Sequence, residues 1–311
     1  MSSLARIPGI KYAVRVRDTL KWAYYGLNGK GFIPGHYHST IPDIRDIHRR
    51  ESRIWPDFPE SLPGIDLNEE EQISVLDEFA GYYADMPYKE PMTSSTRYTR
   101  NNSVYPISDA TALYSMIRKL KPQRIIEVGS GYSSCVMMDT NELFFEDKIQ
   151  ITFVEPYPDR LISLMKNGDL NKYRLIKSEL QNMDKDMFLS LQANDILFID
   201  STHVSKIGSD VNCIIFELLP LLNRGVHIHF HDIFYPFEYP KQWIYRERYW
   251  WNENYILRAF LQYNDSYKIV FFNTYLEHFH KEKYRKLIPV GHGETLPDVT
   301  HQGSIWLKKV K

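Results

Sequence analysis

A short apolar run followed by a glycine turn offers the clearest chemistry in this chain. Residues 124–128 are rich in β-branched side chains, as is typical of a buried parallel strand, and Glu127 lies near the end of the run. Gly129 and Gly131 follow, so backbone N–H groups of the turn can approach a ligand closely. A carboxylate here suits a ligand with an ammonium group or ribose hydroxyls, and Ser134 replaces the third glycine of the dinucleotide fingerprint. A tight strand–helix turn of an ordinary α/β protein is the alternative.

Two more acidic residues come directly after apolar runs. Asp200 ends the run DILFI, His203 follows it closely, and Asp232 comes just after the run GVHIHFH. If the two strands are neighbours, their ends lie roughly 5 Å apart, and carboxylates so close repel each other unless one is protonated or a cation lies between them. Oxygen ligands of this kind favour Mg²⁺ or a similar hard divalent ion. The pattern therefore predicts that both acids face one small volume.

Three histidines need separate consideration. His227, His229 and His231 alternate, so they project to one face of a strand. Imidazoles at this spacing can chelate zinc or iron, but no cysteine or further ligand pattern accompanies them. Histidines that are hydrogen-bonded within a half-buried strand are the alternative. His231 lies nearest the end of the strand, and we keep it as the candidate metal ligand.

The elements that must position these residues alternate between strand and helix. The expected strands are residues 124–128, 150–154, 173–177, 195–199, 225–231, 267–273 and 304–309. The expected helices include residues 133–143, 157–167, 185–191, 211–222 and 252–263. This alternation predicts a doubly wound, mostly parallel α/β sheet with function at the carboxyl ends of its strands. We expect residues 108–311 to form this domain and residues 1–107 to form an N-terminal extension and lid.

The glycine turn and its flanking residues resemble motif one of class I S-adenosylmethionine (SAM)-dependent methyltransferases. Further ordered segments, from about Leu62 to Leu307, are together similar to the bacterial group known as methyltransferase family twenty-four. The segments are PGIDLN, RIIEVGSGYSS, FVEPYPDRL, FIDSTHV, GSDVN, HFHDIFYPFEYP, WNENYILRAFL and GSIWL. The resemblance implies a seven-stranded Rossmann-like sheet whose last strand is antiparallel.

The resemblance also implies which residues bind SAM. The turn contributes the residues under the amino-acid end and ribose of the cofactor, namely Glu127, Gly129, Ser130, Gly131, Tyr132 and Ser133. Glu155 matches the acid that binds the ribose hydroxyls, with a helix cap as the alternative. Glu179 matches the region that holds adenine, with a surface turn as the alternative. NAD-dependent enzymes also have an acid at the place of Glu155, so Glu127 is the residue that separates the two classes.

A more distant similarity links the chain to metal-dependent O-methyltransferases of sugars and catechols. Asp200 and Asp232 match acids that hold Mg²⁺ in those enzymes, and His203 matches the base of the sugar-modifying ones. His231 stands where the sugar enzymes tend to have a second acid. The similarity implies O-methylation of a small-molecule or glycan hydroxyl, with SAM and with Mg²⁺ or another divalent cation. For His203, an interior histidine bonded to the backbone is the alternative.

Two aromatic segments are expected to select the acceptor. Residues 232–251 are too long for an ordinary strand–helix loop, and residues 97–105 precede the expected domain. Their aromatic side chains suit stacking on sugar or aryl faces, and Arg246 or Arg248 suits a phosphate or carboxylate. A structural plug, or a contact between copies in a homo-oligomer, is the alternative.

Composition argues against several classes of partner. The 311 residues contain 38 Lys and Arg against 39 Asp and Glu, so no basic field attracts nucleic acid. No apolar run reaches the roughly 20 residues that span a bilayer, and the first residues lack the apolar core of a signal peptide. Cys135 and Cys213 are the only cysteines, so no disulfide framework is implied and a cytoplasmic location is the default expectation.

The sequence therefore predicts a SAM-dependent methyltransferase that acts on a hydroxyl. One rival is an NAD(P)-dependent oxidoreductase, but its Tyr-x-x-x-Lys pattern is missing near the ends of the fourth and fifth expected strands. The other rival is a noncatalytic protein of the same fold that binds a partner through the aromatic segments. Retention of Glu127, Glu155 and both aspartates argues against the second rival.

Overall fold

The structure is a computed structural model that describes residues 16–17, 19–20, 23–24, 32–88, 96–288 and 303–311. These residues fall into two compact units. The larger comprises the described part of residues 57–241 and 251–311, and the smaller comprises the described part of residues 1–56 together with Gln242–Trp250. Within the described ranges, no helix combines the length and the apolar character that crossing a lipid bilayer requires.

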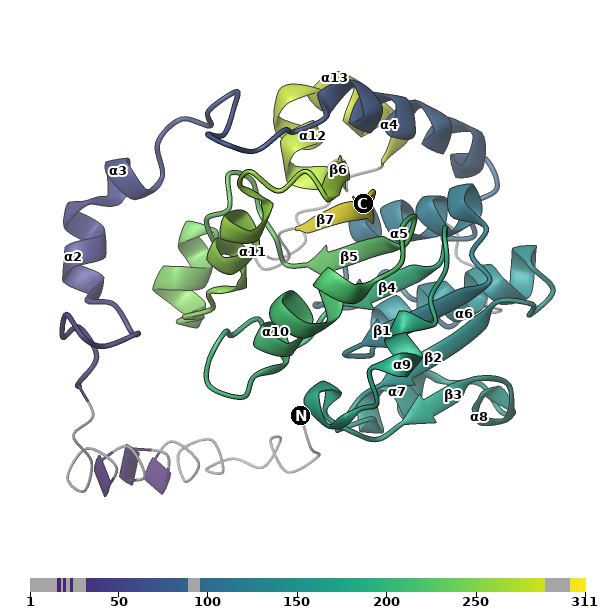
Figure 1. The fold of residues 1–311 in the computed structure, drawn as a ribbon, viewed down its shortest axis with the longest axis horizontal. Helices are drawn as coiled ribbons and strands as arrows, with labels where there is room; N and C mark the ends of the chain where they lie inside the picture. The colour runs from purple at the N-terminus through teal and green to yellow at the C-terminus, as the bar shows by residue number, and fades with distance from the viewer. Residues whose placement is uncertain (1–15, 18, 21–22, 25–31, 89–95, 289–302) are drawn as a thin grey trace. The chain divides into compact units, whose positions relative to one another are not determined.

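A seven-stranded sheet forms the centre of the larger unit (Figure 1). Its strands are β1 (Arg124–Val128), β2 (Gln150–Val154), β3 (Arg174–Ile176), β4 (Ile196–Ile199), β5 (His227–His231), β6 (Tyr267–Phe272) and β7 (Ser304–Lys309). The strand order is β3-β2-β1-β4-β5-β7-β6. Neighbouring strands pair in parallel along the order β3-β2-β1-β4-β5, and β7 is antiparallel to both β5 and β6. The predicted Rossmann-like sheet and its antiparallel last strand are confirmed.

Burial explains why these runs form central strands. Every residue of β4 and β5 is buried, and β1 is buried from Ile125 onward. Strands covered on both faces have near-continuous apolar sequences, and β4 shows this pattern, whereas β5 buries three histidines between its apolar residues. The side chains of Phe198, Phe230 and Trp306, on three adjacent strands, have no exposed surface. The sheet therefore carries the core, and its carboxyl edge is free to hold polar groups.

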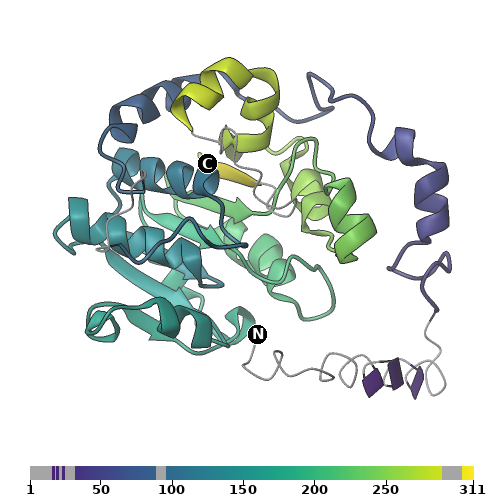
Figure 2. The same cartoon turned by 180° about the vertical axis from the view of Figure 1, so that it is seen from behind.

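Helices cover both faces of this sheet (Figures 1 and 2). They are α4 (Glu69–Tyr83), α5 (Ile107–Leu120), α6 (Tyr132–Phe144), α7 (Asp159–Leu164), α8 (Asp169–Lys172), α9 (Asp186–Leu189), α10 (Asp210–Cys213), α11 (Glu253–Leu261), α12 (Asn273–Phe279) and α13 (Lys281–Leu287). α5 packs against α6, and α4 packs against α5, β6 and α13. Residues 57–88 and 96–107 thus belong to the sheet's unit, although we expected a boundary after residue 107. The lid role of residues 1–107 stays a prediction.

Prolines account for two differences from the expected helices. The single helix expected at 211–222 is instead α10, a π-helical turn (Ile214–Leu218) and a 3₁₀ turn (Leu219–Leu221). Pro220 has no N–H to donate and its ring crowds the preceding turn, so a regular helix cannot continue through it. α7 begins at Asp159 and not at residue 157, because Pro158 occupies the capping position.

The smaller unit contains α2 (Ile44–Arg49), α3 (Glu51–Ile54) and a π-helical turn at Trp243–Glu247. The ring of Tyr245 stacks on His48 at a centroid distance of 4.3 Å, and its hydroxyl donates to Glu51 at 3.0 Å. The long aromatic segment expected at 232–251 is thus divided between the two units.

Candidate active site

A cavity of about 310 Å³ lies at the edge of the sheet where the parallel strands end. It is lined by Val104, Tyr105, Gly129, Ser130, Gly131, Tyr132, Ser133, Glu155, Arg160, Asp200, Ser201, Thr202, His203, His231, Asp232 and Trp251. Most of the predicted SAM residues therefore share one volume with the predicted metal ligands and base. This is the position that a doubly wound sheet favours for a ligand.

The two glycines of the turn are present for different physical reasons. Gly129 has a φ of +80°, and a Cβ at this position would lie 1.7 Å from the backbone oxygen of Asp200. Gly129 is thus required because the turn passes directly against the end of β4. A Cβ on Gly131 would meet only the Cδ atom of Arg160, at 3.5 Å, which is an ordinary contact. Gly131 therefore leaves space in the cavity and is not needed for the turn.

Glu127 lies beneath the turn and not in the cavity wall. Its side chain is completely buried and accepts hydrogen bonds from the hydroxyls of Ser133, at 2.6 Å, and Ser134. Burial raises the pKa of Glu127 to about 8, against the opposing effect of these hydroxyls. The geometry ties the carboxyl to the first turn of α6, and Glu127 is not among the residues that line the cavity.

Glu155 lies in the cavity wall and also caps the chain that follows it. Its Oε2 accepts from the backbone N–H of Ser130 at 3.0 Å, and its Oε1 accepts from that of Tyr157 at 2.7 Å. Both interpretations of this residue therefore have a structural basis, because each carboxylate oxygen keeps a further lone pair for a ligand. Glu179 is exposed outside the cavity and accepts from the side chain of Gln181 at 3.1 Å. The structure does not bring Glu179 to the site, which matches the surface-turn interpretation.

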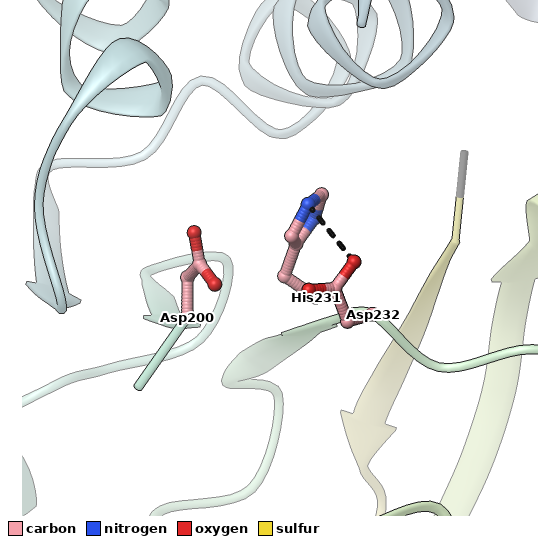
Figure 3. A group of neighbouring side chains, drawn as sticks. All are labelled: Asp200, His231 and Asp232. Atoms are coloured by element: carbon pink, nitrogen blue, oxygen red, sulfur yellow. Dashed lines mark ion pairs between the residues drawn. The ribbon is translucent and has the colours of Figure 1, made fainter. Parts of the chain in front are cut away.

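Asp200, His231 and Asp232 form the candidate metal site (Figure 3). β4 and β5 are paired neighbours, and one ligand atom from each of the three residues lies within 4.8 Å of the others. His231 Nε2 is 3.5 Å from Asp232 Oδ1, and its Nδ1 has no hydrogen-bond partner among the described residues. Two carboxylates and an imidazole are a donor set that fits a divalent cation.

The two carboxylates of this site are not equivalent. Burial raises the pKa of Asp232 above its usual range, whereas for Asp200 the nearby His231 and His203 outweigh burial and hold the pKa below it. This is the behaviour of neighbouring acids that cannot both ionise freely.

His203 is held between these acids and a third carboxylate. Its Nε2 lies 3.4 Å from Asp200 Oδ1 and 3.5 Å from Asp232 Oδ2. Burial lowers the pKa of His203, but the bonds to Asp200 and Glu253 outweigh it, so the pKa lies well above its ordinary value. His203 and Asp232 both have left-handed backbone, with φ of +58° and +56°. Such strain in residues other than glycine is concentrated at functional sites.

Glu253 is the residue that the sequence analysis missed. It begins α11, is only 1 % exposed, and its Oε2 lies 2.9 Å from His203 Nδ1. The backbone N–H groups of Asn252 and Glu253 also donate to the carbonyl of His203, at 3.1 and 3.2 Å. The segment WNENYILRAFL carried the only signal, because it belonged to the family resemblance. Its contact with a histidine 50 positions earlier could not be inferred.

Aromatic rings stand beside both histidines of the cavity. The ring of Trp251 lies 4.4 Å from that of His203, and the ring of Tyr105 lies 5.1 Å from that of His231. Both rings line the cavity, so each of the expected aromatic segments contributes one aromatic residue to the site. Other residues of the longer segment, such as Tyr235 and Phe237, are buried, as the structural-plug alternative expects.

Arg97 anchors the shorter segment. Its guanidinium is buried and pairs with Asp139 at 2.9 Å and with Asp169 at 2.6 Å. Two backbone N–H groups, of Arg97 and Tyr98, also donate to Asp139. These bonds fix the start of the segment on α6, and Tyr105 follows a few residues later in the cavity wall.

Comparisons with known proteins bear on the identity of this site. A family described as a methyltransferase domain matches residues 126–233, which include the turn, Glu155 and both aspartates. An uncharacterized protein of Archaeoglobus fulgidus is 39% identical over 176 residues, covering 54% of this chain and 77% of the relative.

Two solved structures are also similar to this chain. The SAH-bound methyltransferase PaMTH1 of Podospora anserina is 16% identical, with a TM-score of 0.42, over 88% of this chain and 99% of that one. The O-methyltransferase TomG from Streptomyces achromogenes, involved in tomaymycin synthesis and in complex with SAM, is 11% identical, with a TM-score of 0.39, over 86% of this chain and 96% of that one. The match to the methyltransferase domain spans the glycine turn and the ends of β2, β4 and β5, and it identifies the chain as a class I SAM-dependent methyltransferase of family twenty-four.

Proposed function

We propose that this enzyme methylates a hydroxyl group of a small molecule or glycan and that a divalent cation assists it. The observation that carries the proposal is the convergence of the glycine turn, Glu155, His203 and the two aspartates in one cavity. A cavity that held only a cofactor would have no use for two neighbouring carboxylates and a strained histidine. The convergence is what a hydroxyl acceptor beside the cofactor requires.

The turn and Glu155 are suited to hold the cofactor. SAM supplies a methyl group on a positively charged sulfur. The turn, kept against β4 by Gly129, presents backbone groups of Ser130 and Gly131 to the cavity, and Glu155 has lone pairs for ribose hydroxyls. Glu127 fixes the first turn of α6 through its two serine partners. Its role in this proposal is to hold the turn, rather than to touch the cofactor.

Asp200, Asp232 and His231 would hold the cation. Its chemistry is that of a Lewis acid, which lowers the pKa of a bound hydroxyl. The imidazole in place of a further acid suits Mn²⁺ as well as Mg²⁺. The orphaned Nδ1 of His231 and the unequal acidities of the two aspartates are the features that support this assignment.

His203 is the proposed base. When the Nδ1–H group of His203 donates to Oε2 of Glu253, the lone pair of the neutral imidazole is at Nε2, on the side of the two aspartates. Nε2 is then the atom that accepts the proton of the acceptor hydroxyl. Without a cation to balance them, the negative charges of Asp200, Asp232 and Glu253 favour the protonated imidazole of His203, which cannot act as a base. Proton acceptance by His203 thus requires that their charge be balanced.

An acceptor screen tests this proposal. The purified enzyme is incubated with SAM, Mg²⁺ or Mn²⁺, and a panel of sugars, catechols and simple amines, and S-adenosylhomocysteine is measured. We expect turnover with a hydroxyl acceptor that EDTA abolishes and the cation restores. Turnover with amines alone would refute O-methylation, and full turnover after chelation would refute the role of the cation. SAM binding without turnover on any acceptor would support the noncatalytic rival.

A further inference from the structure

A second cavity, of about 370 Å³, lies at the opposite edge of the sheet, where the parallel strands begin. Its wall includes His227, the first residue of β5, and Lys308, which is paired with His227 across β5 and β7. The five residues of β5 separate this cavity from the candidate active site by about 13 Å. Its volume is in the range of small-molecule sites.

His227 points to a polar occupant. The residue is 4 % exposed, and its Nδ1 has no hydrogen-bond partner among the described residues. Buried polar atoms are almost always paired, so an unpaired imidazole nitrogen on a residue of the cavity wall favours a polar occupant.

Charged groups of both signs line the cavity. Lys119 is paired with Glu78 at 2.6 Å, whereas Lys308 forms no ion pair within the described residues. Burial, together with the charges of Lys308 and Lys119, lowers the pKa of His227 to about 4, so positive charge dominates around the imidazole. Glu71, in the first turn of α4, accepts from the neutral amide of Asn68 at 2.6 Å and forms no ion pair among the described residues. The wall therefore offers a positive region near His227 and a separate carboxylate.

Four apolar side chains also line the cavity. They are Val75, Met116, Leu120 and Val270. A ligand that satisfies all three regions has an anionic group, a cationic group and an apolar tail.

We propose that this cavity is a second binding site, which takes a small zwitterion of the class of aliphatic α-amino acids. The carboxylate contacts Lys308 and His227, the ammonium group contacts Glu71, and the aliphatic side chain packs on the apolar wall. This site is independent of the proposed methyl transfer, since none of its residues lines the candidate active site.

The test is a titration of the full chain with L-leucine, followed by the ¹⁵N resonances of labelled histidine side chains. The resonance that disappears in His227→Gln identifies His227. We expect a saturable shift of this resonance with L-leucine. Leucinamide lacks the carboxylate and 4-methylpentanoic acid lacks the ammonium group, so each should bind at least roughly tenfold more weakly, as the loss of a charged hydrogen bond predicts.

Matched variants locate the binding. Lys308→Met and Glu71→Gln should each weaken L-leucine binding roughly tenfold, whereas Lys268→Met, on the neighbouring strand and outside the cavity, should not. Circular dichroism and thermal unfolding verify that each variant is folded. The proposal is overturned by the absence of a saturable shift up to roughly 10 mM, by equal binding of leucinamide, or by unchanged affinity in Lys308→Met. Binding that survives in Lys308→Met but is lost in Gly131→Val would instead place the ligand in the active site and would equally overturn it.

Discussion

The two glycines of the turn should respond to substitution in opposite ways. In Gly129→Ala, the new Cβ would lie 1.7 Å from the backbone oxygen of Asp200, at a position whose backbone φ is +80°. The left-handed backbone costs about 1–2 kcal/mol and the forced displacement about 1–3 kcal/mol more, so unfolding should become easier by about 2–5 kcal/mol. In Gly131→Ala, the Cβ meets Arg160 at 3.5 Å, so stability should stay within about 0.5 kcal/mol of the wild type.

Urea unfolding and SAM calorimetry together test this reasoning. Gly131→Val should unfold like the wild type but bind SAM roughly 5- to 150-fold more weakly, because its side chain enters the cavity at a cost of about 1–3 kcal/mol. Gly129→Ala should instead lower the urea midpoint as its main defect. If Gly129→Ala is as stable as the wild type, the close approach of the turn to β4 is wrong. If Gly131→Val binds SAM normally, the cavity beside Gly131 is not the cofactor site.

Three further outcomes follow from other buried groups. Because the pKa of buried His227 is about 4, against 6.5 in the unfolded chain, its stabilising effect is present above pH 6.5 and is lost as the pH falls towards 4. Between pH 7 and pH 5, the free energy of unfolding measured in urea should fall by about 2 kcal/mol less in His227→Gln than in the wild type or in the exposed control His278→Gln. Parallel pH dependences of the three proteins would refute this. Arg97→Met leaves buried carboxylates unpaired and should cost about 3–5 kcal/mol, whereas the exposed Arg174→Met should cost little; equal urea midpoints would count against the anchor. Glu253→Gln should lower kcat roughly 10- to 100-fold with SAM affinity unchanged, because a charged hydrogen bond to His203 is lost; an unchanged kcat would leave Glu253 with a structural role only.

Much of the fold could be predicted because its strands are buried on both faces. The bounds of β1, β2 and β7 match the predicted ones, since each strand centres on a short apolar run, namely Ile125–Ile126, Phe153–Val154 and Ile305–Leu307. The helix expected at 211–222 was wrong in form, because the effect of Pro220 on the preceding turn outweighed the apolar pattern. The family resemblance, rather than the periodicity, supplied the antiparallel position of β7.

The site could be predicted only where one strand end determines the position of a residue. Asp200 and Asp232 directly follow neighbouring strands, so their proximity followed from the order of the sheet. Glu127 also ends a strand, but the hydroxyls of α6 draw its carboxyl away from the cavity, which sequence spacing does not reveal. The contact of Glu253 with His203 depends on how α11 packs, and tertiary contacts of this kind have no local signal.

Titration calorimetry of the purified chain with SAM tests the central claim most directly, with NAD and NADP as comparison ligands and with Glu155→Ala as the variant. The account predicts that the wild type binds SAM but neither nicotinamide cofactor. Glu155→Ala should weaken SAM binding at least tenfold, since hydrogen bonds from the ribose hydroxyls to a carboxylate contribute roughly 1.5–3 kcal/mol each. A wild type that does not bind SAM, or that binds it with the same affinity as a folded Glu155→Ala variant, would contradict the account.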